Sequence, residues 1–369
     1  MTVIALTGAT GDVGYEACRQ LALVAEVTKI VITARSKEQA QAVIAQLKAD
    51  TGKDFFEYVV VNFRDLNSIM AAVSAFPKLD RLCLNAGGLG RCTMHAASGV
   101  TDAMVDNVLG HSILSDNLIK FGKISPGGRI VYVGSEVSRV IWSFRGLLPV
   151  YWRFGEKDIE WSMTSNYNGD CCFCVPIRRQ LGDYKNSKII GQTFYAAVAK
   201  ELPAIHTMSV SPGGIGGSFA ERGVFPLNLL MQHAPWMFSM INITHSLEEG
   251  AKRYVDVLTG DTPTWEPGSM AFSGPNCAGF ECWTPWTGQL GPGCLWGALG
   301  PMVDNRAYEP YLRDEELNAK VAKAVRKYQD KWADNVLNEG MERDDMLPPS
   351  PVRTRYGKGS NWVSEREML

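Results

Sequence analysis

The sequence lacks several features that would indicate whole classes of function. Its 37 Lys and Arg residues nearly balance 39 Asp and Glu residues, which gives a formal net charge of −2, so no positive excess would attract nucleic acid or an anionic membrane. The first apolar run, residues 3–6, is far too short for a signal-peptide core or a transmembrane helix. No internal repeat is evident. We therefore expect a soluble globular protein with no nucleic-acid partner and no transmembrane span.

The cysteines do not indicate a disulfide framework. They number nine, an odd count, and no secretory signal precedes them. We therefore expect free thiols in a reducing compartment: the cytoplasm, or a plastid or mitochondrion if a transit peptide is missing from this sequence. Cys171, Cys172 and Cys174 lie close together, but no fourth ligand follows at a suitable spacing. The sequence therefore predicts ordinary thiols and no metal site.

Apolar segments of strand length alternate with segments of helical periodicity through the first half of the chain. This alternation predicts an α/β fold with a doubly wound parallel sheet. A hydrophobic content of 46% over 369 residues allows a sizeable core in one large domain or two modest ones. The expected strands are residues 2–7, 30–34, 56–61, 79–84 and 129–133, and the expected helices are residues 15–24, 37–49 and 66–76.

A glycine turn joins the first expected strand to the first expected helix. Strand, glycine turn and helix in this order are typical of dinucleotide binding. Glycines let backbone N–H groups approach a pyrophosphate, which the positive end of the helix attracts. Asp12 either faces the phosphates or caps the helix, and a turn without any ligand is the alternative for the whole segment. The predicted cofactor contacts here are Gly8, Thr10, Gly11, Asp12, Val13 and Gly14.

The residue after the second expected strand indicates which dinucleotide binds. An NAD site usually presents a carboxylate to the ribose 2′-hydroxyl, whereas an Arg accommodates the 2′-phosphate of NADP. This chain has Arg35 and no acid until Glu38, which favours NADPH, although a solvated surface Arg is the alternative. Further predicted cofactor contacts follow the third and fourth strands, where small residues let a strand end lie flat against a cofactor: Asn62, Phe63, Asn85, Ala86 and Gly87.

Tyr184 and Lys188 carry the chemistry that the sequence predicts. They stand four residues apart in a helix that we expect to begin near Leu181, so their side chains share one face. An ammonium beside a phenol favours the phenolate and should lower the pKa of Tyr184 from about 10. Tyr184 is therefore a candidate proton donor or acceptor for a carbonyl–alcohol pair. A solvated Tyr and Lys on a helix face is the alternative.

The order of the motifs resembles that of the short-chain dehydrogenase/reductase superfamily over about residues 1–260. The resemblance rests on the glycine turn, Asn85-Ala86-Gly87, Asn107, Ser135, Tyr184-x-x-x-Lys188 and Ser211-Pro212-Gly213. It implies that Tyr184 is the acid/base and that Lys188 binds the nicotinamide ribose and depresses the pKa of Tyr184. Ser135 would hydrogen-bond the substrate oxygen, with Ser138 as a weaker rival. Asn107 would hold a water of the proton relay, and Pro212 and Gly213 would border the nicotinamide.

Some positions depart from the usual pattern of this superfamily. The glycines have the spacing of its extended and atypical branches, with Asp12 where the classical branch has its middle glycine, and Asn62 replaces the Asp that usually contacts adenine. The sequence further resembles the light-dependent protochlorophyllide reductases and, next, retinol-dehydrogenase-like enzymes, through residues 129–135, the insertion before Tyr184 and residues 246–251. In the reductases a cysteine follows the Pro-Gly pair, whereas Gly214 stands there in this chain.

Segments outside the common pattern predict how the chain is divided. We expect a main domain over residues 1–260, with an aromatic insertion at about 139–180 that forms a lid or substrate wall. Residues 219–245 are either a hydrophobic cover, a membrane-surface contact or a helix pair packed on the core. Residues 262–301 are expected to be irregular loop. Within the extension at 261–369, a helix beginning near Asp314 should pack on the main domain through Leu317, Val321, Val325, Tyr328 and Trp332.

Together these features predict an NADPH-dependent oxidoreductase. Hydride would move to or from a carbonyl or alcohol on a bulky hydrophobic substrate, with Tyr184 exchanging the proton. One alternative is a protochlorophyllide-reductase-like enzyme that reduces a C=C bond. Another alternative is a non-enzymatic scaffold that senses NADPH. It is less favoured because the sequence contains a proton donor, which a sensor would not need. The substrate, the favoured direction and the oligomeric state stay open.

Overall fold

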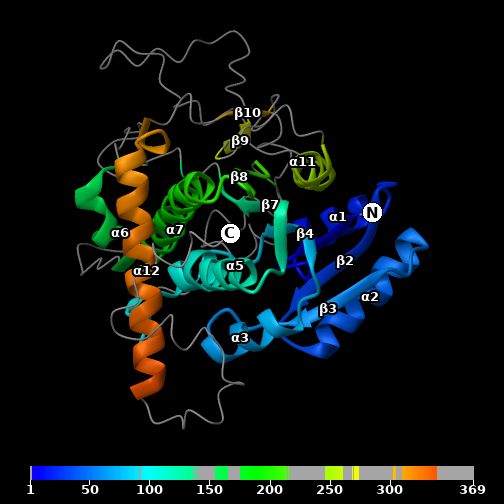
Figure 1. Ribbon diagram of the computed structural model, residues 1–369, viewed down its shortest axis with the longest axis horizontal. Coiled ribbons are helices and arrows are strands. Elements are labelled where there is room, and N and C mark those ends of the chain that lie inside the picture. The colour runs from blue at the N-terminus through cyan, green and yellow to red at the C-terminus, as the bar shows by residue number, and fades with distance from the viewer. Residues whose placement is uncertain are drawn as a thin grey trace.

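A central sheet with helices on both faces forms the body of the protein (Figure 1). The computed structural model describes residues 2–90, 93–135, 138, 154–164, 175–213, 215, 246–260, 268, 270–273, 302–304 and 310–338. The strands of the sheet are β1 (Thr2–Leu6), β2 (Val27–Ala34), β3 (Phe56–Val60), β4 (Leu79–Leu84), β7 (Ile124–Val133), β8 (His206–Val210), β9 (Met270–Ser273) and β10 (Met302–Asp304).

The order of the strands is that of a doubly wound sheet. Six parallel strands run in the order β3-β2-β1-β4-β7-β8, so the predicted fold class is confirmed. β9 adds a further parallel strand beside β8, and β10 pairs antiparallel with β9. The chain winds outward from β1 in one direction and then in the other. The topological switch point therefore lies between β1 and β4, where open α/β sheets bind ligands.

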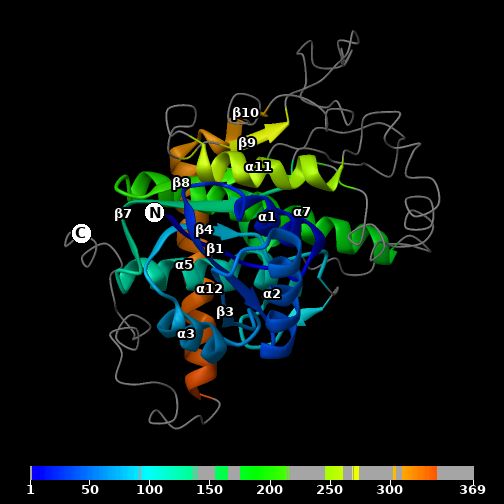
Figure 2. The same cartoon turned by 90° about the vertical axis from the view of Figure 1, so that its right-hand side faces the viewer.

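The two faces of the sheet are covered by different helices (Figures 1 and 2). One face packs on α1 (Asp12–Leu21), α2 (Lys37–Thr51) and α11 (Leu247–Thr259), and the other on α3 (Leu66–Ala75), α5 (Gly110–Lys120) and α7 (Val175–Glu201). Strand residues alternate between the two cores: Ile4 and Leu6 lie in the first, whereas Ala5 lies in the second. Because both faces are buried, the parallel strands read as almost continuous apolar runs.

The C-terminal helix packs on the body of the fold, as predicted. This helix, α12 (Glu315–Asn338), begins where the Asp314 carboxylate accepts a hydrogen bond from the Leu317 N–H at 3.0 Å. It lies against α7, as Figure 1 also shows. All five side chains expected on its apolar face are buried in the same core as the side chains of α7: Leu317, Val321, Val325, Tyr328 and Trp332.

The described part of the aromatic insertion packs on this C-terminal segment. It consists of a short 3-10 helix, η3 (Glu156–Asp158), and α6 (Ile159–Thr164). Phe154 meets Tyr311 edge-to-face at 5.6 Å between ring centroids, and the Tyr328 hydroxyl donates to Glu160. The expected lid residues Trp142, Phe144, Tyr151 and Trp152 lie outside the described residues, as do residues 219–245 and the cysteines at 171, 172 and 174.

Several boundaries differ from the predictions. α7 begins at Val175 and not near Leu181, because Pro176 is tolerated in a first turn, where a missing N–H leaves no bond unmade. Residues 262–301 are not all loop, since β9 lies within them. A hairpin of β5 (Met94–His95) and β6 (Val100–Thr101) was not predicted. Nor was the π-helical geometry of η1 (Val105–Leu109), which α4 (Asp102–Met104) precedes. No helix in the described part of the chain is long and apolar enough to cross a membrane.

Candidate active site

The carboxyl ends of four adjacent strands bring the predicted site residues to one edge of the sheet. Leu6 of β1 pairs with Cys83 of β4, Leu84 pairs with Tyr132 of β7, and Val133 pairs with Val210 of β8. The segments that follow these strands therefore lie side by side. They are the glycine turn, Asn85-Ala86-Gly87, Gly134-Ser135 and Ser211-Pro212-Gly213.

The glycine turn brings α1 very close to the end of β1. Gly8 has φ +75°, which favours glycine. A Cβ at Gly14 would lie 2.4 Å from the Gly8 carbonyl oxygen, whereas a Cβ at Gly11 would lie 3.6 Å from that atom. Gly11 is the N-cap of α1, so Asp12 is not the N-cap residue. Asp12 instead occupies the first helical turn and is exposed, like Thr10, while Val13 is half-buried.

Asn85 braces the glycine turn from the neighbouring strand. Its side-chain N–H group donates to the Thr7 carbonyl at 2.9 Å, and its side-chain oxygen accepts from the Tyr254 hydroxyl at 3.0 Å. The backbone N–H groups of Asn85 and Ala86 both donate to Thr7 Oγ1 at 2.8 Å. Tyr254 comes from α11 and is buried. Sequence reasoning missed Tyr254, and no local signal marks it, because it reaches Asn85 from 169 residues away.

The hydrogen bonds around Thr7 fix the tautomer of His111. A Thr hydroxyl has two acceptor sites and one donor, and two N–H groups already occupy the acceptor sites. The hydroxyl therefore donates to His111 Nε2, which lies 3.2 Å away. The proton of the imidazole then resides on Nδ1, which donates to the Asn107 carbonyl at 3.3 Å. Burial lowers the pKa of His111 to about 3, with a further contribution from the Lys188 ammonium, so this link is neutral at physiological pH.

The Asn107 side chain holds the loop after β4. It lies in η1, and its Oδ1 accepts from the Gly88 N–H at 3.1 Å while its Nδ2 donates to the Gly88 and Ala103 carbonyls at 2.9 and 2.8 Å. Gly87 has φ +146°, and a Cβ there would lie 2.1 Å from Asn107 Oδ1. Both amide hydrogens of Asn107 are thus used within the protein. This contact also requires glycine at position 87.

Tyr184 and Ser135 meet at the edge of the sheet. Their side chains form a hydrogen bond. Tyr184 is buried in the middle of α7, and Ser135 is half-buried at the end of β7. Burial raises the pKa of Tyr184 to about 12, and the bond from Ser135 offsets this only in part. The predicted lowering of the Tyr184 pKa is therefore wrong for the free protein, because desolvation of the phenolate outweighs the neighbouring amine.

Lys188 lies beneath Tyr184 and is itself buried. Its Nζ donates to the Val133 carbonyl at 2.8 Å and lies 5.4 Å from the centre of the Tyr184 ring. Burial lowers the pKa of Lys188 to about 7, so the ammonium loses part of its charge near neutral pH. The shared helix face that the four-residue spacing predicted is present in the structure.

Ser138 supports the loop and does not rival Ser135. Its hydroxyl donates to the Ser135 carbonyl at 2.8 Å and lies 3.3 Å from the side-chain oxygen of Gln192 on α7. Ser138 is buried, and its hydrogen bonds are to the Ser135 backbone and to Gln192. The side chain of Ser138 therefore fixes the backbone that carries Ser135.

The residues predicted to bind the nucleotide moiety lie at the ends of β2 and β3. Arg35 is exposed and directly follows β2, and Ser36 caps α2 by accepting from the Gln39 N–H at 3.3 Å. The Asn62 side-chain oxygen accepts from the Arg64 N–H at 3.2 Å in a local turn. Phe63 packs edge-to-face on His111 with 4.5 Å between ring centroids. The segment after β3 therefore contacts the His111 ring that is hydrogen-bonded to Thr7.

The segment after β8 completes the edge. The buried Ser211 hydroxyl accepts from the Gly213 N–H at 3.1 Å, and its carbonyl accepts from the Arg253 guanidinium at 3.5 Å. Gly213 has φ +82°, a conformation that glycine adopts without strain. Pro212 and Gly213 are half-buried, and they follow β8 directly beside Ser135.

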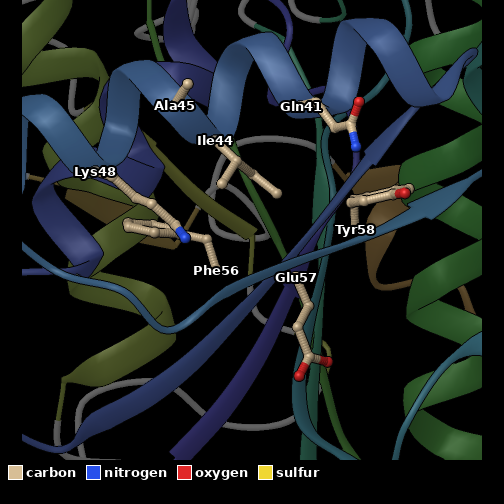
Figure 3. A pocket seen from close by; sticks show the side chains of 7 residues that line it. All are labelled: Gln41, Ile44, Ala45, Lys48, Phe56, Glu57 and Tyr58. Carbon is tan, nitrogen blue, oxygen red and sulfur yellow. The ribbon is translucent and has the colours of Figure 1, made fainter.

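A surface hollow elsewhere on the sheet is separate from this site. It has a volume of about 620 Å³ and lies between α2 and the edge strand β3 (Figure 3). None of its lining residues belongs to the predicted site. They are Gln41, Ile44, Ala45, Lys48, Phe56, Glu57 and Tyr58.

Known proteins share both the sequence pattern and the fold. The model of the short chain dehydrogenase family matches residues 2–146. The chain is 24% identical over 259 residues to dehydrogenase/reductase SDR family member 13 of Bos taurus, which covers 66% of this chain and 62% of that protein. It is 24% identical over 217 residues to retinol dehydrogenase 12 of Homo sapiens, which covers 57% of this chain and 60% of that protein. The chain thus spans about three fifths of the length of these curated relatives.

The similarity of fold extends over most of the chain. A solved structure of an uncharacterized protein from Mycobacterium paratuberculosis superposes with a TM-score of 0.55 at 16% identity, covering 89% of this chain and 93% of that one. The family match begins in β1 and includes the glycine turn, Asn107 and Ser135. The sequence match, the two relatives and the doubly wound fold agree. The predicted resemblance to the short-chain dehydrogenase/reductase family is therefore confirmed, with the family match spanning residues 2–146.

Proposed function

We propose that this protein is an NADPH-dependent oxidoreductase that transfers hydride to or from a carbonyl or alcohol on a bulky hydrophobic substrate. The observation that carries the proposal is the hydrogen bond between Tyr184 and Ser135, near Lys188 and at the same edge of the sheet as the glycine turn. A carbonyl oxygen placed between two such hydroxyls would receive two hydrogen bonds, which stabilise the negative charge that develops there during reduction.

In this proposal Tyr184 exchanges the proton. Its raised pKa keeps the phenol protonated at neutral pH, so Tyr184 is ready to donate to the substrate oxygen in the reductive direction. Ser135 orients that oxygen. Lys188 donates to the Val133 carbonyl and to no other described residue, so in this proposal its remaining N–H groups donate to a ribose hydroxyl. Its charge would favour the phenolate that remains after transfer.

The chain offers a binding surface that fits a dinucleotide. The turn at Gly8 and the close approach at Gly14 give the backbone the shape that a pyrophosphate requires, at the positive end of α1. We assign the 2′-phosphate to Arg35, the adenine to Asn62 and Phe63, and the nicotinamide border to Pro212 and Gly213. The assigned contacts of the strand ends are Asn85, Ala86 and Gly87. When bound, the nicotinamide would supply or accept the hydride.

The proposal of a bulky hydrophobic substrate rests on the composition of the insertion and on one relative. The aromatic insertion holds Trp142, Phe144, Tyr151 and Trp152, and apolar walls suit hydrophobic ligands. One relative is named retinol dehydrogenase 12, and retinol is an apolar alcohol. Retinoids are therefore among the first substrates to test. We further propose that the main domain ends at residue 260 and that the protein resides in a reducing compartment. The two described cysteines, Cys18 and Cys83, are buried free thiols.

A substrate screen tests the proposed function. Purified protein with NADPH or NADH is offered ketones, retinoids and porphyrin pigments, in the dark and in light, and cofactor oxidation is followed. We expect dark turnover of a bulky apolar carbonyl with preference for NADPH. Ser135→Ala should lower kcat/KM at least tenfold, whereas Ser138→Ala, which removes a hydroxyl of the same loop but not the partner of Tyr184, should cause a clearly smaller loss.

Three outcomes would contradict the proposal. Turnover that requires light and a pigment would indicate C=C reduction. Tight cofactor binding without turnover of any compound would indicate a sensing scaffold. Equal losses for both serine variants would show that Ser135 acts only through the fold of its loop.

A further inference from the structure

Lys188 lies between two aromatic rings, of which the reaction uses only one. Its Nζ is 5.4 Å from the centre of the Tyr184 ring and 5.3 Å from the centre of the Tyr132 ring. Both distances are within the range of cation–π attraction. Among the described residues, the Val133 carbonyl is the sole hydrogen-bond acceptor of this ammonium. A buried charge with so few polar partners depends on other sources of stabilisation.

Tyr132 is held rigidly in this position. It lies on β7, directly before Val133, and is completely buried. One side of its ring stacks on Tyr195, with 4.9 Å between centroids and an interplanar angle of 21°. Its edge fits against α7 at Gly191, where a Cβ would lie 2.2 Å from the Tyr132 hydroxyl oxygen. Glycine at position 191 is therefore needed to admit this ring.

The ring of Tyr132, and not its hydroxyl, is the part that contacts another functional group. The buried hydroxyl has no hydrogen-bond partner among the described residues, although most buried hydroxyls have one. In the part of the chain that the structure describes, the titratable groups that face Lys188 are Tyr184 on its own helix, Tyr132 from β7 and the neutral His111 from α5. None of these is a carboxylate, so the charge of the ammonium is stabilised by ring faces and one carbonyl.

We propose that Tyr132 is a positioning residue that holds the Lys188 ammonium beneath Tyr184 and keeps it charged through the face of its ring. The inference rests on the role proposed for Lys188 in the reaction. It adds Tyr132 of β7, which belongs to none of the sequence motifs, to the residues that support the site. Burial lowers the pKa of Lys188 to about 7, so the lysine titrates in a range where a modest loss of stabilisation changes its charge under working conditions.

A graded change in the ring tests the inference without changing its shape. Position 132 is replaced by phenylalanine, 3,5-difluorophenylalanine and 3,4,5-trifluorophenylalanine, since fluorine withdraws charge from the ring face. The pKa of Lys188 is read from the NMR titration of its side-chain resonance in the protein without cofactor, assigned by its absence in Lys188→Met. We expect little change for Tyr132→Phe and a stepwise fall of roughly one pH unit over the fluorinated series.

The same series at Tyr195 is the matched control. That ring stacks on Tyr132, whereas the rings that Lys188 contacts are those of Tyr132 and Tyr184, so fluorination at position 195 should leave the Lys188 titration unchanged. With a substrate in hand, the alkaline limb of kcat/KM should move to lower pH in parallel with the NMR values, because deprotonation of Lys188 removes the charge beside Tyr184.

The outcomes separate this inference from the proposed function. A Lys188 pKa that does not depend on fluorination, or that responds equally to both series, would overturn the role of Tyr132. Absence of turnover in the unmodified protein would overturn the proposed function and leave the NMR test intact. If Tyr132→Leu also folds, its Lys188 pKa should fall at least as far as in the trifluorinated protein, and an unchanged value would overturn the inference.

Discussion

Substitution of Gly14 by alanine is the sharpest test of the glycine turn. The new methyl group would lie 2.4 Å from the Gly8 carbonyl oxygen and 2.9 Å from Asn85 Nδ2, about 1 Å closer than an ordinary contact to that oxygen allows. Neither neighbour can swing away freely. Gly8 belongs to the turn itself, and the Asn85 amide is fixed by Thr7 and Tyr254. The helix must therefore move away from the end of β1.

The expected loss of stability follows from two opposing terms. Overpacking in a well-packed region costs about 1–3 kcal/mol, whereas replacing a glycine inside a helix by alanine gains about 0.5–1 kcal/mol. We expect the free energy of unfolding of Gly14→Ala to fall by up to about 2.5 kcal/mol. We also expect NADPH affinity to fall at least tenfold, because the turn proposed to hold the pyrophosphate is displaced. Urea titration and NADPH fluorescence measure the two quantities.

Gly11→Ala is the matched control for stability. The nearest atom to its new methyl group would be the Gly8 oxygen at 3.6 Å, which is an ordinary contact. The backbone at Gly11, with φ −97° and ψ 159°, also suits alanine. Its free energy of unfolding should stay within about 0.5 kcal/mol of the parent. Equal stability of the two variants, together with unchanged NADPH affinity in Gly14→Ala, would refute the account of the turn.

Two further predictions concern the hydrogen bonds behind the site. The unfolded chain takes up a proton at His111 near pH 6.5, whereas the folded chain does so only near pH 3. The contribution of His111 should therefore lower the free energy of unfolding by about 1.4 kcal/mol per pH unit as the pH falls between these values. Urea titrations at several pH values should show a smaller slope for His111→Gln. An identical slope would contradict the assignment of a neutral His111. Tyr254→Phe removes the hydroxyl that donates to the Asn85 side-chain oxygen and should lower the free energy of unfolding by about 1–2 kcal/mol, measured by thermal unfolding. Tyr58→Phe is the control, because the Tyr58 hydroxyl has no partner among the described residues.

The sequence was sufficient to predict which motifs meet. Parallel strands place their carboxyl ends at one edge of a sheet, so the segments after β1, β4, β7 and β8 had to lie together once the alternation of strands and helices was recognised. The spacing of Tyr184 and Lys188 similarly placed both on one face of a helix. The apolar face of α12 was predicted from its period alone, and all five of its residues are buried.

Features that depend on tertiary contacts were missed or wrongly predicted. The direction of the Tyr184 pKa depends on burial, which a four-residue spacing cannot reveal. Tyr254 and His111 bond to residues more than 100 positions away in sequence. β9, within a segment rich in Gly and Pro, is a strand because it pairs with β8. Short strands of this kind have little local signal, since β-propensity depends mainly on neighbours.

The most direct test of the central claim is single-turnover reduction by Tyr184→Phe. This change keeps the ring beside Lys188 and removes the hydroxyl that bonds to Ser135. With NADPH saturating and a carbonyl substrate from the screen, the rate of hydride transfer should fall roughly 10²–10⁴-fold, while the NADPH dissociation constant changes less than about threefold. A rate within tenfold of the unmodified protein at unchanged cofactor affinity would contradict the claim that Tyr184 donates the proton.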